Sequence, residues 1–71
     1  MISSKLIRAA RVLLDWEQRT LAERSGVSLP TIQRMEKLGP ERSSAGNVDK
    51  VQRALEAAGV EFTNGDQPGV R

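Results

Sequence analysis

The sequence predicts an all-α fold of four helices, followed by a short C-terminal β-strand or hairpin. Apolar residues recur at helical spacing through most of the first 58 positions, and glycine and proline breaks divide them into segments of helix length. After position 59 apolar residues alternate with polar ones, which is typical of a strand. Because 71 residues build only one core, we expect one domain in residues 1–59 and a tail in residues 60–71.

The composition narrows the classes of function. A hydrophobic fraction of 38% and a charged fraction of 28% suit a soluble globular chain rather than a disordered or membrane one. Cysteine and histidine are absent, so we expect no disulfide and no metal site with thiolate or imidazole ligands. A metal site built only from oxygen ligands stays open, but no clustered carboxylate spacing suggests one, and we expect no metal and no cofactor. Eleven Lys and Arg against nine Asp and Glu leave a net charge of only +2. Nucleic-acid binding must therefore rest on where the charges lie, and not on their sum.

The N-terminal residues raise the question of targeting. No apolar run approaches the ~20 residues that span a bilayer. The start resembles a targeting peptide, because Arg8 and Arg11 precede the first acid, Asp15. An amphipathic first helix is the preferred interpretation, since the pattern runs straight into the core. We expect a cytoplasmic protein without a membrane partner.

The first helix is expected to begin after Ser3 or Ser4, either of which is a suitable N-cap, and to run to about Leu14. Apolar residues form one stripe along it, and Arg8 and Arg11 are expected opposite that stripe on a solvated face. The predicted stripe comprises Leu6, Ile7, Ala10, Leu13 and Leu14.

The second helix is expected from Gln18 to Ser25. Trp16, the only Trp, precedes it and is expected to act as a core wedge at the helix junction. Glu17 is a weaker cap than Ser or Thr, although its charge favours a helix N-terminus. Gly26 supplies the left-handed conformation that a sharp turn after the helix needs.

The third helix is expected to begin after Ser28 as its N-cap and to stop at Gly39–Pro40. Pro30 lies in its first turn, where no backbone donor is lost. Residues 39–47 predict a loop by composition. The fourth helix begins at Ser44 or Asn47, a choice that the sequence leaves open, and ends before Gly59. Its inward residues are predicted to be Val48, Val51, Leu55 and Ala58.

The tail predicts a hairpin. Val60 and Phe62 alternate with polar residues, and Asn64–Gly65 signals a tight turn. A lone hairpin this short is barely stable in water. It therefore packs on the helices, pairs with a second chain or frays, and the second outcome makes the tail a candidate dimerisation element.

Residues 18–37 have the layout of a helix-turn-helix motif. A face of apolar side chains joins the second and third helices across the turn at Gly26. What remains outside on the third helix is mostly polar or basic, and a helix with such a face fits the major groove of B-form DNA. The inward residues are Leu21, Ala22, Val27, Ile32 and Met35.

The outer face of the third helix predicts contacts to double-stranded DNA. Arg34 suits a bidentate pair with guanine, and Leu29 suits contact with a thymine methyl. Gln18 is placed to donate to a phosphate together with the backbone amides of the second helix. Each polar residue also has an ordinary explanation as a solvated side chain, but their arrangement on one motif favours DNA. The other candidates are Ser28, Thr31 and Gln33 for phosphates or bases, and Lys37 and Arg42 for the DNA backbone.

Residues 6–62 resemble the Cro/CI-type (Xre-type) helix-turn-helix domains of phage and bacterial transcriptional regulators. The matching pattern is LLDWEQRTLAERSGVSLPTIQRMEK, followed by a short loop and DKVQRALEAAGVEF. The resemblance implies a lambda-repressor-like domain of four to five helices that binds operator DNA as a two-fold dimer. It also implies base reading by Leu29, Pro30 and Arg34, and phosphate contacts by Gln18, Thr31 and the loop around Arg42.

Three residues depart from the pattern of these regulators. Asp15 stands where Gly often ends the first helix, and Glu17 stands where Ser or Thr usually caps the second. Pro30 occupies a position that often reads a base with a polar side chain. Proline leaves only apolar contact there.

The sequence thus predicts a sequence-specific transcriptional regulator that acts as a homodimer, with no small-molecule ligand. Repression by occupying an operator is the simplest expectation, because no effector domain follows. The alternatives are a DNA-binding antitoxin, or a helix-turn-helix fold used only for protein–protein contact. An enzyme is disfavoured, because nothing in the sequence assembles a nucleophile and a base.

Overall fold

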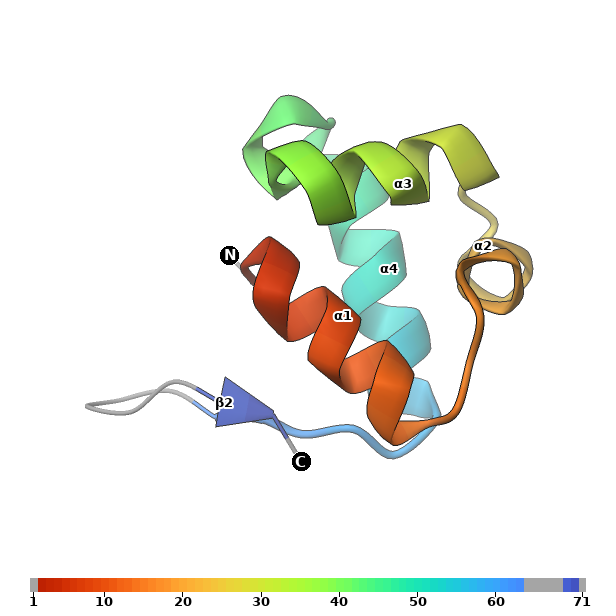
Figure 1. The fold of residues 1–71 in the computed structure, drawn as a ribbon, viewed down its shortest axis with the longest axis vertical. Coiled ribbons are helices and arrows are strands. Elements are labelled where there is room, and N and C mark those ends of the chain that lie inside the picture. Colours follow the sequence, from red (N-terminus) through yellow and green to blue (C-terminus); the bar gives the residue numbers. More distant parts are fainter. Residues whose placement is uncertain (1, 64–68, 71) are drawn as a thin grey trace.

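The computed structural model describes residues 2–63 and 69–70. Within these ranges the fold is all-α and compact, with four α-helices, as predicted. Figure 1 shows α1 in front of α4, with α3 lying across their upper ends and α2 to one side. The helices are α1 (Ser4–Leu13), α2 (Gln18–Ser25), α3 (Leu29–Leu38) and α4 (Ala45–Ala57), with a 3₁₀ helix η1 (Pro40–Arg42) between the last two.

The helix-turn-helix segment has the predicted boundaries. Gly26 ends α2 with φ of 73°, a left-handed conformation that glycine adopts without a steric penalty. Ser28 caps α3, because its Oγ accepts a hydrogen bond from the Thr31 amide at 3.4 Å. Both signals lie within a few residues of the helix end that they determine. Short-range chemistry alone therefore sets this turn.

α1 begins after Ser3, whose Oγ accepts a hydrogen bond from the Leu6 amide at 3.2 Å. The helix ends at Leu14, its C-cap, and Asp15 follows with φ of 57°. A residue with a Cβ in the left-handed region costs roughly 1–2 kcal/mol, and Asp is among the residues that tolerate it best. Asp15 thus adopts the left-handed conformation that glycine usually supplies at the end of a helix.

The segment between α3 and α4 differs from the predicted loop. Residues 40–42 form η1, and α4 begins at Ala45 rather than after residue 47. Ser44 is the N-cap, because its Oγ accepts from the Asn47 amide at 3.2 Å. The loop prediction for residues 39–47 was therefore too long. Ser44 serves as the N-cap of α4 instead, and Gly46 and Asn47 lie in its first turn.

The core contains residues from all four helices and also Val60, which lies after α4. Trp16 packs against it as a partly buried side chain, with the Arg24 guanidinium 5.6 Å from its ring centroid. Val60 is 4% exposed and belongs to the core, so the chain after α4 folds back onto the helices. The remaining buried apolar residues are Ile2, Ile7, Ala10, Leu21, Val27, Ile32, Met35, Val48, Val51 and Leu55.

Two residues predicted to face the core do not. Leu13 is 59% exposed, and Ala58 is also exposed. The buried stripe of α1 instead passes through Ile7 and Ala10 to Leu14, with Arg11 beside it. The helix is thus rotated about its axis relative to the prediction. That rotation turns Leu13 towards solvent.

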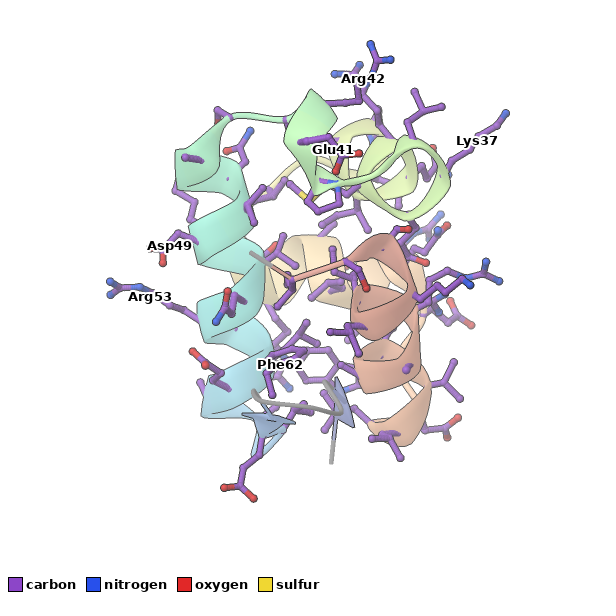
Figure 2. All side chains as sticks on the ribbon, turned by 90° about the vertical axis from the view of Figure 1, so that its left-hand side faces the viewer. Lys37, Glu41, Arg42, Asp49, Arg53 and Phe62 are labelled. Carbon is purple, nitrogen blue, oxygen red and sulfur yellow. The ribbon has the colours of Figure 1, made fainter. Side chains whose placement is uncertain are left out.

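The tail contains two short strands, β1 (Phe62–Thr63) and β2 (Gly69–Val70), which pair antiparallel. Figure 2 places Phe62 at the lower end of the molecule, where it packs against the core between α4 and α1. The predicted turn at Asn64–Gly65 lies outside the described residues, so the hairpin and its role in dimerisation stay predictions. No helix of the described chain is long and apolar enough to cross a membrane.

Candidate nucleic-acid interface

The outer face of α3 carries the side chains that the sequence assigns to DNA. Ile32 and Met35 are fully buried on the inner face, with Glu36 beside them. The period of 3.6 residues per turn then turns Gln33, Arg34 and Lys37 outward. Figure 2 shows Lys37 projecting away from the body of the protein. The exposed candidates on this helix are Pro30, Gln33, Arg34 and Lys37, and the half-buried candidates are Leu29 and Thr31. Leu38, at the end of the helix, is also exposed.

The hydroxyl groups of Ser28 and Thr31 lie at the start of α3 and bind each other. Their oxygens are 2.8 Å apart, and either one can donate. In such a pair one hydroxyl hydrogen is used and the other stays free. The pair therefore keeps one donor for a phosphate or a base while it holds the first turn of α3 in place.

Gln18 is the first residue of α2 and is half-buried. The N-cap residue before it, Glu17, makes no side-chain hydrogen bond to the helix. The amides of the first turn of α2 thus lack a side-chain cap, and free amides at a helix N-terminus bind anions. The Glu17 carboxylate next to them opposes an anion, so the side chain of Gln18 has to present the donor.

An open groove of about 550 Å³ lies between α1, the start of α2 and α3. It brings together three of the candidate DNA contacts, Gln18 from α2 and Gln33 and Lys37 from α3. It also contains charged residues that the prediction did not include. The lining residues are Arg8, Arg11, Glu17, Gln18, Gln33, Glu36 and Lys37.

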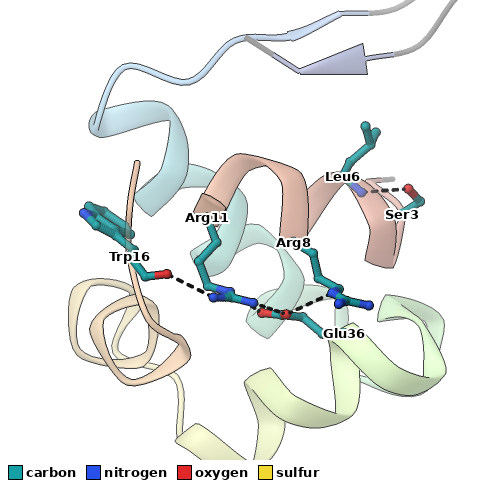
Figure 3. A network of polar contacts seen from close by, with 6 residues as sticks. All are labelled: Ser3, Leu6, Arg8, Arg11, Trp16 and Glu36. Atoms are coloured by element: carbon teal, nitrogen blue, oxygen red, sulfur yellow. Dashed lines mark hydrogen bonds and ion pairs between the residues drawn. The ribbon is translucent and has the colours of Figure 1, made fainter. Parts of the chain in front are cut away.

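Arg11 and Glu36 form a partly buried ion pair in this groove, drawn in Figure 3, in which the Arg11 side chain is 17% exposed. Arg11 Nε and Nη2 each donate to one carboxylate oxygen of Glu36 at 3.0 Å, and Nη1 donates to the Trp16 carbonyl at 3.0 Å. Glu36 is only 7% exposed. The prediction that Arg11 lies on a solvated face is therefore wrong. Its guanidinium links α1 to α3 and to the turn before α2.

Arg8 approaches the same carboxylate without closing on it. Its Nε is 3.9 Å from Glu36 Oε1, and its side chain is 65% exposed. Exposed pairs of this kind contribute about 0–1 kcal/mol. Arg8 thus keeps the solvated position that the sequence predicts, and its charge stays available at the edge of the groove.

Arg42 lies apart from this groove, on η1 beyond the end of α3 (Figure 2). Gly39 leads into η1 with φ of 101°, which residues with a Cβ rarely adopt. A Cβ at that position would also lie 2.5 Å from a Glu41 carboxylate oxygen. The glycine therefore permits the turn that carries Arg42 to the surface.

The profile of the helix-turn-helix family matches residues 7–62. This range covers most of the chain and includes every candidate contact residue. The chain belongs to the Cro/CI-type (Xre) helix-turn-helix family. It is accordingly a DNA-binding regulator. A comparison with curated proteins finds no significant match.

For this helix-turn-helix regulator, sequence reasoning found the outer face of α3 but missed the support beneath it. Glu36 follows Ile32 by four residues and therefore lies on the inner face of α3. A buried acid requires a cation from a facing helix. Arg8 and Arg11, three residues apart on one side of α1, offer that cation. This combination was the signal in the sequence that could have revealed the pair.

Proposed function

We propose that this regulator is a repressor that binds a pseudo-palindromic operator as a homodimer, with α3 of each protomer in the major groove. Arg34 carries the proposal. It lies in the middle of α3 on the exposed face, and none of the ion pairs within the described residues involves it. An exposed arginine at this position is free to form a bidentate pair with the O6 and N7 atoms of a guanine.

Apolar contacts complete the proposed base reading. Leu29 and Pro30 stand in the first turn of α3, where recognition helices contact base edges. Neither side chain donates a hydrogen bond, so both suit thymine methyl groups. We infer half-sites in which a guanine lies close to one or more thymines.

The remaining candidates would position the domain on the DNA backbone. Gln18, Ser28 and Thr31 lie at the N-terminal ends of α2 and α3, where donors suit phosphates. Gln33 shares the groove with Gln18 and stands beside the base-reading face. Lys37 and Arg42 extend the charged surface beyond α3. Contacts of this kind set register and carry no base preference.

The size of the domain supports two copies on adjacent half-sites. Its longest extent is 31 Å, and half-sites read by such dimers are about 34–36 Å apart, one turn of B-form DNA. Two domains therefore fit side by side on one face of the duplex. A dimer in that position blocks access to the DNA beneath it, which is sufficient for repression. We also propose that this regulator is located in the cytoplasm, where its operator lies.

Selection from a random duplex pool tests the proposal. We expect enrichment of a motif with two half-sites whose centres are about 34–36 Å apart, and an affinity for the selected duplex that falls steeply with salt. A shuffled duplex of the same composition serves as the control. Failure to enrich any motif above the input pool contradicts sequence-specific binding, and enrichment of a single half-site contradicts the dimer.

A further inference from the structure

The outer surface of α1 exposes two large apolar side chains next to each other. Val12 is 68% exposed and Leu13 is 59% exposed. Together with Lys5, Arg8 and Ala9 they line an open groove of about 550 Å³, and we call these five residues the α1 patch. Contiguous apolar surface that is rimmed by polar residues marks interaction sites, whereas scattered single apolar residues are ordinary.

The α1 patch lies on the side of α1 that faces away from the core. Ile7 and Ala10 are fully buried on the opposite side, and Figure 1 shows α4 behind α1. No described part of the chain covers Val12 or Leu13. Their exposure is therefore a property of the folded domain.

The charge of the α1 patch is positive. Lys5 and Arg8 are exposed beside the apolar residues, and Ser4–Leu13 contains no acid. Arg11 does not contribute to this charge, because Glu36 pairs with it in the neighbouring groove, which shares Arg8 with the α1 patch. The surface thus combines an apolar centre with two cations along its edge.

We propose that the α1 patch binds an acidic amphipathic helix of a partner protein. Such a helix presents apolar side chains at positions i, i+3 and i+4 and carries Glu or Asp on both flanks. Its apolar side chains would cover Val12 and Leu13, and its carboxylates would meet Lys5 and Arg8. The complementary charge steers the encounter, and burial of the apolar pair holds the complex.

Other occupants fit the α1 patch less well. A DNA phosphate gains nothing from Val12 and Leu13. A second copy of this chain would bring the cations of one patch against those of the other, because a two-fold interface uses the same surface twice. A membrane needs more apolar surface than two side chains offer.

The test uses the full chain labelled with ¹⁵N and a synthetic helical peptide with leucines along one face and glutamates on both flanks. One control peptide has lysine in place of every glutamate, and a second has the same composition with the leucines shuffled around the helix. We expect amide chemical-shift changes confined to α1 with the first peptide, and at least about tenfold weaker binding of both controls.

Substitutions on the protein side locate the binding surface. Leu13→Ser should weaken peptide binding about tenfold, since it removes half of the apolar pair. Lys5→Glu should weaken it roughly two- to fivefold, as exposed ion pairs do. The matched controls are Leu38→Ser, at another apolar residue that is 55% exposed, and Lys50→Glu on α4, and both should bind the peptide normally.

Several results would overturn the proposal. They are an absence of shifts on α1, equal binding of the lysine peptide, and unchanged binding by the Leu13→Ser variant. Binding to vesicles of phosphatidylglycerol and phosphatidylcholine without binding to the peptide would identify a membrane surface instead. A dimer in sedimentation that Leu13→Ser dissociates would identify a second copy. If Leu13→Ser does not fold, Val12→Ser replaces it, because Val12 is the more exposed of the two.

Discussion

Arg11 of α1 and Glu36 of α3 are joined by two parallel hydrogen bonds, each 3.0 Å long, in the groove between these helices. The third arm of the guanidinium binds the Trp16 carbonyl. One side chain thus fixes α3 relative to α1 and to the turn that leads into α2. We therefore expect the orientation of the proposed DNA-reading face to depend on this contact between α1 and α3.

Breaking this pair from one side should be costly. Arg11→Met leaves the Glu36 carboxylate buried without its partner, and we expect the free energy of unfolding to fall by about 3–5 kcal/mol. Arg11→Met combined with Glu36→Leu should restore much of that loss, because no charge then remains buried. Urea unfolding followed by circular dichroism measures both.

Arg8→Ala is the control for the pair, and it should change stability by less than about 1 kcal/mol because Arg8 is exposed. If the double variant is no more stable than Arg11→Met alone, packing rather than charge explains the loss.

Arg34 should determine one base in each half-site. We expect Arg34→Ala to lose about 1–3 kcal/mol of discrimination at a single position while the preference at other positions persists. Competition binding against every single-base variant of the selected operator measures this. Uniform weakening across all of the variants would show that Arg34 contacts the DNA backbone instead.

Lys37 and Arg42 should act through phosphates. Lys37→Ala and Arg42→Ala are each expected to weaken binding to all sequences alike and to lower the slope of log K against log salt by about one. Arg53→Ala is the matched control, because Arg53 is exposed on α4 and paired with Asp49 at 2.8 Å, away from both residues in Figure 2. An equal change of slope in the control would indicate a general charge effect.

The tail should contribute to dimerisation. Truncation after Thr63 removes β2 and keeps Val60, which is part of the core. We expect a helical, folded chain with a weaker dimer in sedimentation velocity, because the two-stranded β1–β2 sheet, whose free edge would pair with a second chain, is then lost. Truncation after Gly59 is the less informative variant, since it also removes a core residue. If the chain truncated after Thr63 forms a dimer of unchanged affinity, the deleted part of the tail does not belong to the interface.

Local features of the chain could be derived from the amino acids alone. The bounds of α2, the caps at Ser28 and Gly26, and the division of α3 into an apolar and a polar face all followed from neighbours within about four residues. The chemistry involved is short-range, because a cap binds the next turn and a helical face repeats every 3.6 residues. The resemblance to helix-turn-helix regulators rests on this same local pattern.

Other features depended on contacts between segments that are distant in the sequence. Leu13 faces solvent, and Arg11 is partly buried against Glu36. Helical periodicity says which residues share a face, but the rotation of each helix about its own axis is set by the helices that pack against it. An arginine on an amphipathic helix is therefore ambiguous until its neighbour is known. Arg8 and Arg11 are one turn apart in the same sequence pattern, and only the position of Glu36 on α3 makes one of them a surface charge and the other a structural link.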